Sequence, residues 1–339
     1  MAEPERAAEP EASGWPVPWQ AVPGERGGAL AWLEYAAYRA ATGGLARLPG
    51  GLRRAVVGTL AHVGRRVDRR HASAARDFIR TAFEHTGRPL DDAELTRRVH
   101  QAYVHLIECT LTQYRVRHTL RSTPDRAAAL RARTELALGE EAHAALERGG
   151  CVIVSAHCGD WEMASQLVGA HGFEPLYVIS KGPKNRYMAR HLQALRESQG
   201  VRLLPRRGAM ASAKAVLRGD ARLAMLLDQR ARTNPLVVPF FGRPARCDRS
   251  AAVLLKRLGC PVVFLAAYKT GDLHWRLEGQ AVLRPEAARG ASTDELTARV
   301  NAELERLIMT APEQQFWLHD RYRGAPPAEG GVDSAAAGS

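Results

Sequence analysis

The sequence lacks any uninterrupted run of about 18 to 20 apolar residues, which is the length that a membrane-spanning helix requires. It also lacks the pattern of a secretory signal: its first stretch, MAEPERAAEPEASG, is acidic and rich in Pro and Ala. The five cysteines are odd in number and contain no CxxC pair. A disulfide framework and a zinc ribbon are therefore disfavoured, and a reducing compartment is expected.

Lysine is also scarce, since only five of the 48 basic residues are lysines and the others are arginines. A GC-rich genome produces that bias by itself. The 48 basic residues outnumber 36 acidic ones, giving a net charge of +12 and a pI near 10.0. This balance favours anionic partners, such as acidic proteins, phosphorylated substrates or an acidic membrane surface. A nucleic-acid binder is the least favoured class, because the basic residues are dispersed and are not interleaved with aromatic ones.

The hydrophobic pattern changes once along the chain. Before the Gly149-Gly150 pair, apolar residues recur at helical spacing, and no convincing strand is visible. After it, short β-rich runs alternate with helical segments, which predicts an α/β fold with a mixed, mostly parallel sheet flanked by helices. The expected organisation is a disordered N-terminus at 1–26, an all-helical lead-in at 27–148, an α/β core at 149–324 and a disordered tail at 325–339.

The strands and helices expected in the core can be listed by residue. Strands are expected at 151–156, 175–179, 201–205, 221–227, 260–268 and 273–283. Helices are expected near 162–171, 185–199, 208–218, 249–258 and 292–310. The last two strands flank Thr270-Gly271-Asp272, which is typical of a hairpin turn.

The lead-in contains a stretch at 28–66 that is apolar on one side and basic on the other. Leu30, Trp32 and Leu33 are followed by arginines that include Arg53 and Arg66. One or two amphipathic helices lying on an anionic membrane surface would account for this composition. A helical hairpin that packs its apolar side on the core of the same protein accounts for it equally well.

The stretch VIVSAHCGDWE places one base and two acids where an apolar strand gives way to a helix. His157 follows the strand directly, at the edge where reactive groups of open α/β sheets tend to lie. Glu162 falls in the first turn of the next helix, from where it could hold one ring nitrogen of His157 and leave the other free to accept a proton. Asp160 is expected to cap that helix. Two alternatives remain: a purely structural histidine, or a metal site formed by His157, Asp160 and Glu162.

Four segments stand out in order along the chain: SAHCGDWE, with the H-x4-D/E pattern, ISKGPKNRYMARHLQALRESQG, LLDQRARTNPLVVPFFGRPA and APEQQFWLHDRYR. In this order they resemble the bacterial lipid A biosynthesis acyltransferases, a family within the lysophospholipid acyltransferase superfamily. The resemblance implies an enzyme that moves a fatty acyl chain from acyl carrier protein, or from acyl-CoA, to a hydroxyl of a phosphorylated glycolipid. It implies no cofactor and no metal, and it implies work at the cytoplasmic face of the bacterial inner membrane.

The resemblance also implies roles for individual residues. His157 would be the general base, and Glu162 would orient it. Arg196 would bind a phosphate or the thioester oxygen, and Asp228 would be the acidic residue after the next strand. Two basic groups could contact phosphates or an acidic carrier protein; the residues expected to bind substrate among them are Arg207, Arg230 and Arg243.

The chain departs from many relatives at two positions of this pattern. It reads Asp228-Gln229-Arg230 where they read DQD, and it reads His319-Asp320-Arg321 where they read HRR or HKR. The acceptor headgroup is therefore open, with a mannosylated phosphoinositide or another phospholipid as the alternative to a lipid A precursor and a metal-dependent hydrolase as the remaining reading. Phe316 and Trp317, in contrast, are expected to anchor the core.

Overall fold

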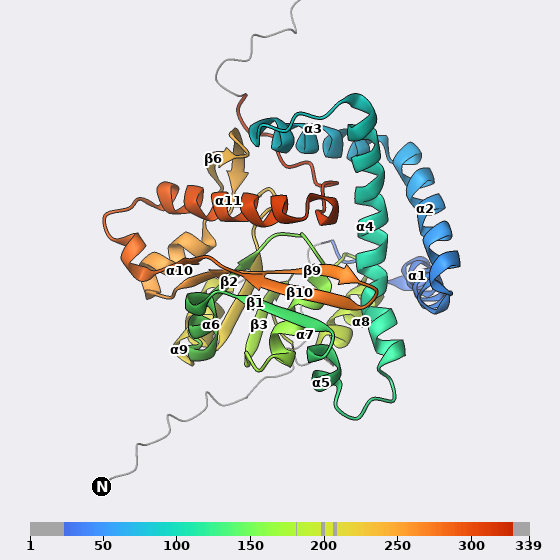
Figure 1. The fold of residues 1–339 in the computed structure, drawn as a ribbon, viewed down its shortest axis with the longest axis horizontal. Helices are drawn as coiled ribbons and strands as arrows, with labels where there is room; N and C mark the ends of the chain where they lie inside the picture. The colour runs from blue at the N-terminus through green and yellow to red at the C-terminus, as the bar shows by residue number, and fades with distance from the viewer. Residues whose placement is uncertain (1–23, 181, 198–200, 206–208, 328–339) are drawn as a thin grey trace, which may run out of the picture.

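The computed structural model describes residues 24–180, 182–197, 201–205 and 209–327. Its helices pack around a central group of strands, with α11 on one side of the strands and α6 and α7 on the other (Figure 1). The α-helices are α1 (Gly28–Arg47), α2 (Gly50–Val67), α3 (Arg69–His85), α4 (Asp92–Thr119), α5 (Arg126–Arg131), α6 (Glu140–Arg148), α7 (Trp161–Ala170), α8 (Arg186–Glu197), α9 (Ala209–Arg218), α10 (Ser250–Leu258) and α11 (Thr293–Thr310).

The main sheet has six strands in the order β11-β8-β2-β5-β3-β4. All neighbours in it are parallel except β11, which runs antiparallel to β8. The prediction of a mixed, mostly parallel sheet is thus confirmed. Its strands are β2 (Val152–Ser155), β3 (Leu176–Ser180), β4 (Arg202–Pro205), β5 (Arg222–Leu226), β8 (Val262–Phe264) and β11 (Val282–Leu283).

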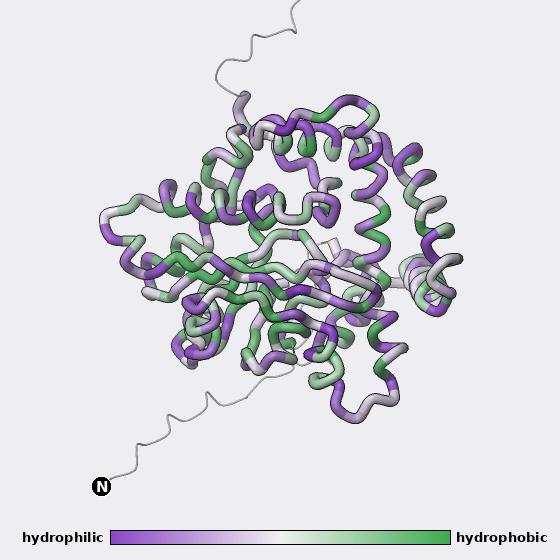
Figure 2. Tube along the Cα trace, in the orientation of Figure 1, coloured by the Kyte–Doolittle hydropathy of each residue, from purple (hydrophilic) through white to green (hydrophobic). Residues whose placement is uncertain are grey.

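The side chains of β2 show why this sheet forms where it does. All four residues of β2 are buried, as expected for a parallel strand that helices cover on both faces. Val152 and Val154 point into the core cluster that contains α10 and α11, and Ile153 points into the cluster that contains α6 and α7. The hydropathy trace in Figure 2 accordingly shows apolar segments through the centre of the molecule.

Two smaller sheets complete the fold. One has the order β1-β10-β9, formed by β1 (Thr134–Leu138), β9 (Ala266–Gly271) and β10 (His274–Gly279). The expected hairpin between 260–268 and 273–283 is present as the antiparallel pair of β9 and β10. The other sheet is the hairpin of β6 (Leu236–Phe240) and β7 (Arg243–Cys247).

The structure corrects two of the expectations about strands. The segment 27–148 is not wholly helical, because β1 pairs in parallel with β10 over five residues. Its sequence TELAL contains good helix formers, and the long-range pairing overrides that preference. The stretch VVPFFGRPARC, where no strand was expected, forms a hairpin; Phe241 and Gly242 both have positive φ, as a tight two-residue turn requires.

The N-terminal helices form a wall beside the sheet, in which α4 contacts α1, α2 and α3 (Figure 1). Asp68 and Asp91 cap α3 and α4 with side-chain hydrogen bonds to backbone N–H groups. In the described part of the chain, no helix has both the length and the apolar character that a bilayer crossing demands. The expected disordered ends fall mostly at residues 1–23 and 328–339, outside the described ranges. Arg26, however, is placed, in a backbone bridge with Asn185.

Candidate active site

The site begins at the turn that joins β2 to α7. Gly159 has a φ of +61°, and a β-carbon there would collide with the carbonyl oxygen of Ala267, so the turn needs glycine on both counts. Two backbone hydrogen bonds join the turn to the segment that precedes Trp317. The N–H of Phe316 donates to the His157 carbonyl at 2.9 Å, and the N–H of Gly159 donates to the Gln314 carbonyl at 2.8 Å. The backbone of His157 is therefore held on a rigid support.

Asp228 is the side chain that orients His157. The two atoms His157 Nδ1 and Asp228 Oδ1 are 2.7 Å apart. Strand pairing accounts for this contact: Ser155 of β2 lies opposite Leu226 of β5, and His157 and Asp228 each follow two residues later. Because parallel neighbours end at the same edge, equal offsets bring the two side chains together.

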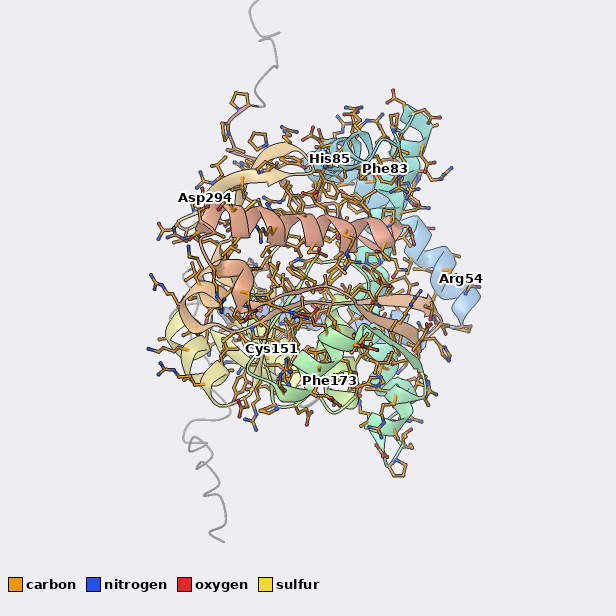
Figure 3. All side chains as sticks on the ribbon, turned by 60° about the vertical axis from the view of Figure 1, so that its left-hand side comes forward. Arg54, Phe83, His85, Cys151, Phe173 and Asp294 are labelled. Atoms are coloured by element: carbon orange, nitrogen blue, oxygen red, sulfur yellow. The ribbon has the colours of Figure 1, made fainter. Side chains whose placement is uncertain are left out.

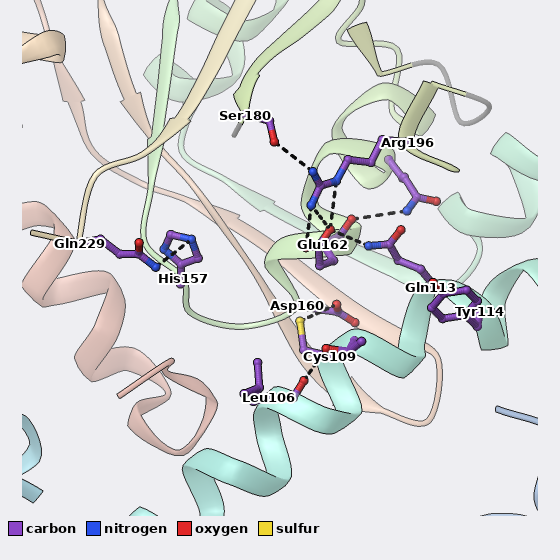
Figure 4. Close-up of polar contacts among 12 residues, drawn as sticks. Leu106, Cys109, Gln113, Tyr114, His157, Asp160, Glu162, Ser180, Arg196 and Gln229 are labelled. Carbon is purple, nitrogen blue, oxygen red and sulfur yellow. Dashed lines mark hydrogen bonds and ion pairs between the residues drawn. The ribbon is translucent and has the colours of Figure 1, made fainter. Parts of the chain in front are cut away.

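The charge of Asp228 fixes which ring nitrogen of His157 can act. Burial raises the pKa of Asp228, but the His157 imidazole, together with hydrogen bonds from His157 and Gln315, outweighs burial and brings that pKa down to about 2. The carboxylate is then an acceptor only, so the proton lies on Nδ1 and the lone pair on Nε2. The Gln229 amide nitrogen lies 3.4 Å from Nε2 (Figure 4). Nε2 is thus the basic atom of the pair.

Glu162 was expected to hold one ring nitrogen of His157, but its carboxylate binds Arg196 and Gln113. Its carboxylate accepts from the Arg196 Nη2 at 2.8 and 2.9 Å and from the Gln113 amide at 2.6 Å (Figure 4). Arg196 also donates to the Ser180 hydroxyl at 3.0 Å. The local spacing correctly placed Glu162 in the first turn of α7. It could not reveal that α8, far along the chain, carries a guanidinium to the same carboxylate.

Asp160 occupies the position before α7, yet its side chain makes no capping hydrogen bond. It is fully buried and accepts from the Trp275 indole at 3.0 Å and from the Cys109 thiol at 3.4 Å. The capping prediction is therefore wrong, and Asp160 ties the turn to β10 and α4 instead. His157, Asp160 and Glu162 face three different sets of partners, so they do not converge as a set of metal ligands. Within the described ranges, no other group of three such residues is arranged to hold a metal.

A cavity of about 1090 Å³ opens beside these groups. His157, Glu162, Arg196 and Gln229 all line it. Its lining comes from β2, β3 and β5 and from α7, α8, α9 and α10, and it combines apolar and cationic side chains. The site therefore offers a base, a fixed ion pair and a large, partly apolar space.

The other residues predicted to bind substrate differ in their position relative to the cavity. Arg230 lines the cavity, and its backbone N–H donates to His319 Nε2 at 3.0 Å. Arg243 does not line it; it pairs with Asp77 of α3 at 2.8 Å and stacks over the Tyr322 ring. Its expected role in substrate binding is thus not supported by its position. Arg207 lies outside the described residues.

Sequence reasoning missed two glutamines that complete the site. Gln315 is fully buried and donates to the second Asp228 oxygen at 3.1 Å, while Gln113 holds Glu162. Gln315 lies in the segment APEQQFWLHDRYR, but nothing in that segment indicates a contact with Asp228, and Gln113 lies in none of the four segments. Trp317 was assigned correctly as a core anchor, since it is buried against Phe78. Phe316 is half-buried and packs against the same core cluster, as expected, and its ring also lies beside the His157 and Trp161 rings, at centroid distances of 6.0 Å.

The comparisons with known proteins give one match. The sequence model of a family described as bacterial lipid A biosynthesis acyltransferase matches residues 29–324, which is most of the chain. Among curated proteins, none matches.

Proposed function

The chain belongs to the bacterial lipid A biosynthesis acyltransferase family, and from that membership we propose a specific reaction for this acyltransferase. It moves a fatty acyl chain from acyl carrier protein, or from acyl-CoA, to a hydroxyl of a phosphorylated glycolipid such as a lipid A precursor. The observation that carries the proposal is the dyad of His157 and Asp228, 2.7 Å apart at the edge of a large cavity.

In the proposed reaction, Nε2 of His157 accepts the proton of the acceptor hydroxyl while its oxygen attacks the thioester carbonyl carbon. The C–O bond forms, the carbonyl oxygen becomes an oxyanion, and the C–S bond then breaks. The departing sulfur takes the proton back from the His157 imidazolium. Asp228 holds the ring and stabilises its charged form, as the carboxylate does in hydrolytic triads. Glu162 holds Arg196 on the cavity wall, where the guanidinium can face a phosphate or the developing oxyanion.

A transfer assay tests the proposal. The purified full chain is incubated with thioesters of acyl carrier protein and of CoA that carry a radiolabelled acyl group, each with a lipid A precursor or a bacterial lipid extract. Label is expected to move into a glycolipid, faster from one of the two donors. Release of free fatty acid without any labelled glycolipid would contradict a transferase and favour a hydrolase.

The role of Glu162 leads to a double-mutant prediction. Glu162→Gln and Arg196→Gln should each lower kcat/KM, and the double variant should lose little more than the worse single variant. The coupling expected for two groups in direct contact is about 1–3 kcal/mol. A parallel cycle of Glu162→Gln with His157→Gln should give much weaker coupling. The reverse order of the two coupling energies would restore Glu162 as the partner of His157.

We further propose that α1 and α2 attach the enzyme to the anionic cytoplasmic surface of the inner membrane. Both helices pack on α4, yet most of the large apolar side chains that are exposed in the described structure lie on them: Leu30, Trp32, Leu33, Leu52, Leu60, Val63 and Val67. Arg54 projects from the outer edge of α2 (Figure 3), and Arg47 and Arg66 are also exposed. A surface with seven exposed apolar side chains and neighbouring arginines is suited to binding an anionic bilayer.

Replacing Leu30, Trp32 and Leu33 together by serine should lower binding to vesicles that contain anionic lipid. A loss of about tenfold or more is expected, because each large apolar side chain contributes about 1.5–3 kcal/mol when fully buried. The fraction of the full chain that floats with the vesicles measures this binding. Val237→Ser is the matched control, since Val237 is 48 % exposed on β6. Equal binding by the triple variant and the control would place the attachment elsewhere.

A further inference from the structure

The cavity beside His157 extends to both faces of the main sheet. Side chains alternate along a strand, so consecutive residues of β5 point to opposite faces. Ala224 packs with the cluster that contains α7, and Met225 belongs to the cluster that contains α10, yet both line the cavity. We call the space on the first face the α7 lobe and the space on the second face the α10 lobe. They meet at the carboxyl edge of the sheet, where His157 lies.

The α7 lobe is apolar and is kept open by small side chains. A helix normally closes against a sheet, but here Ala164 and Ser165 of α7 and Ala224 of the central strand β5 all line the cavity, and their side chains are too small to fill it. Ala224 and Val178 are only half-buried although helices cover that face, because the space above them is not filled. Further lining residues, Ile153, Val168, Leu176 and Leu265, are buried. Leu176 begins β3 and Val168 lies near the end of α7, so both lie at the end of the lobe away from His157, its deep end.

Polarity falls along this lobe from the site inward. Ser180, at the end of β3, accepts from Arg196 at the entrance, whereas Val178 and Leu176 precede it on the same face of the strand. A ligand that fits the lobe therefore has a polar group beside His157 and an unbranched apolar chain behind it. A fatty acyl thioester has that order of polarity.

The α10 lobe is different in character. Its lining includes Arg230, Arg249, Lys256 and Arg257, with one acidic residue, Asp248. Arg249, Lys256 and Arg257 are exposed, so their charges face an opening to solvent and not a closed core. Guanidinium groups in such a setting suit phosphate.

Resting on the proposed function, we propose that the acyl chain of the donor lies in the α7 lobe and the phosphorylated acceptor in the α10 lobe. Val168 and Leu176, at the deep end, set the longest chain that the enzyme accepts. Ala224 keeps the lobe open midway. The two substrates then approach His157 from opposite faces of the sheet, so that the thioester carbon and the attacking hydroxyl meet at its Nε2 atom.

The test compares kcat/KM of the full-length enzyme across donor thioesters of increasing chain length. Ala224→Leu should block the lobe and lower the ratio of long-chain to short-chain kcat/KM by about 10- to 100-fold, the discrimination expected for added methylene groups in an apolar pocket. Val168→Ala should shift the preference toward longer chains. Because one substitution shortens the lobe and the other lengthens it, simple damage to the fold cannot produce both shifts.

Two control variants test whether the change in chain-length preference is specific to the α7 lobe. Ala298→Leu makes the same change on a half-buried face of α11 that does not line the cavity, and it should leave the chain-length profile unchanged. Arg257→Gln should raise KM for the glycolipid acceptor without moving that profile. Unchanged profiles in both α7-lobe variants, or a profile that moves with Arg257→Gln, would overturn the assignment while transfer by the wild type continues. Absence of transfer by the wild type would instead overturn the proposed function.

Discussion

Asp228→Asn is expected to lower kcat by about 1,000- to 10,000-fold, the scale found when the carboxylate of a hydrolytic triad becomes an amide. The amide can donate to Nδ1 of His157, and the ring then carries its proton on Nε2, where a lone pair is needed. The geometry at 2.7 Å is otherwise preserved. The measurement is the rate of label transfer from the thioester to the glycolipid at saturating substrates.

The pH dependence sharpens this prediction. The pKa of Asp228 is lowered to about 2, so its carboxylate stays ionised in the folded enzyme as pH falls, until pH approaches that value. Protonation of Asp228 should therefore not lower the wild-type rate above about pH 4, the ordinary range of aspartate. The stability that the ionised form contributes is present above that range and is lost as pH falls toward 2.

Asp77→Asn is the matched control, because Asp77 pairs with Arg243 at 2.8 Å on the surface, away from the cavity. It should keep transfer within about twofold, in line with the small contribution of exposed ion pairs. Asp228→Asn must also retain the wild-type circular dichroism spectrum. Near-normal transfer by a folded Asp228→Asn variant would mean that the histidine needs no ionised partner.

The sequence predicted where the reactive groups lie better than it predicted their partners. His157 was placed after an apolar strand because an abrupt change from β-branched to polar residues is a local signal, whereas Asp228 was identified only through the resemblance to the family. Their pairing depends on β2 and β5 being neighbours in matching register, and strand order is a long-range property. Glu162 lies only five residues from His157, and this nearness in sequence was misleading.

The fold shows the same division between local and long-range information. Helices such as α7 and α11 begin and end within one or two residues of their predicted bounds, because periodicity and caps are local. Strand β1 was missed because β10, which stabilises it, comes from a region more than a hundred residues away. The hairpin of β6 and β7 was missed because Pro239 and Pro244 weaken a strand pattern; they face each other in a two-stranded sheet.

His157→Ala is expected to reduce transfer by about 100- to 10,000-fold, the usual contribution of general acid–base catalysis. The substitution leaves space beside Asp228 and Gln229, and both of these groups can hold a small heterocycle. Added imidazole should therefore restore part of the lost rate. The measurement is transfer at increasing imidazole concentration, with KM for both substrates followed in parallel, because a lost base lowers kcat and leaves KM nearly unchanged.

Two comparisons show whether the rescue reports a base at that position. Glu162→Ala also removes a side chain from the cavity wall, but imidazole should not rescue it, since the missing group holds Arg196 and does not accept the hydroxyl proton. His118→Ala, at an exposed position near the end of α4, should behave as the wild type. Rescue of Glu162→Ala but not of His157→Ala would reverse the two roles and make Glu162 the base. Rescue confined to His157→Ala would place proton acceptance at Nε2, because this is the ring nitrogen that Asp228 leaves free.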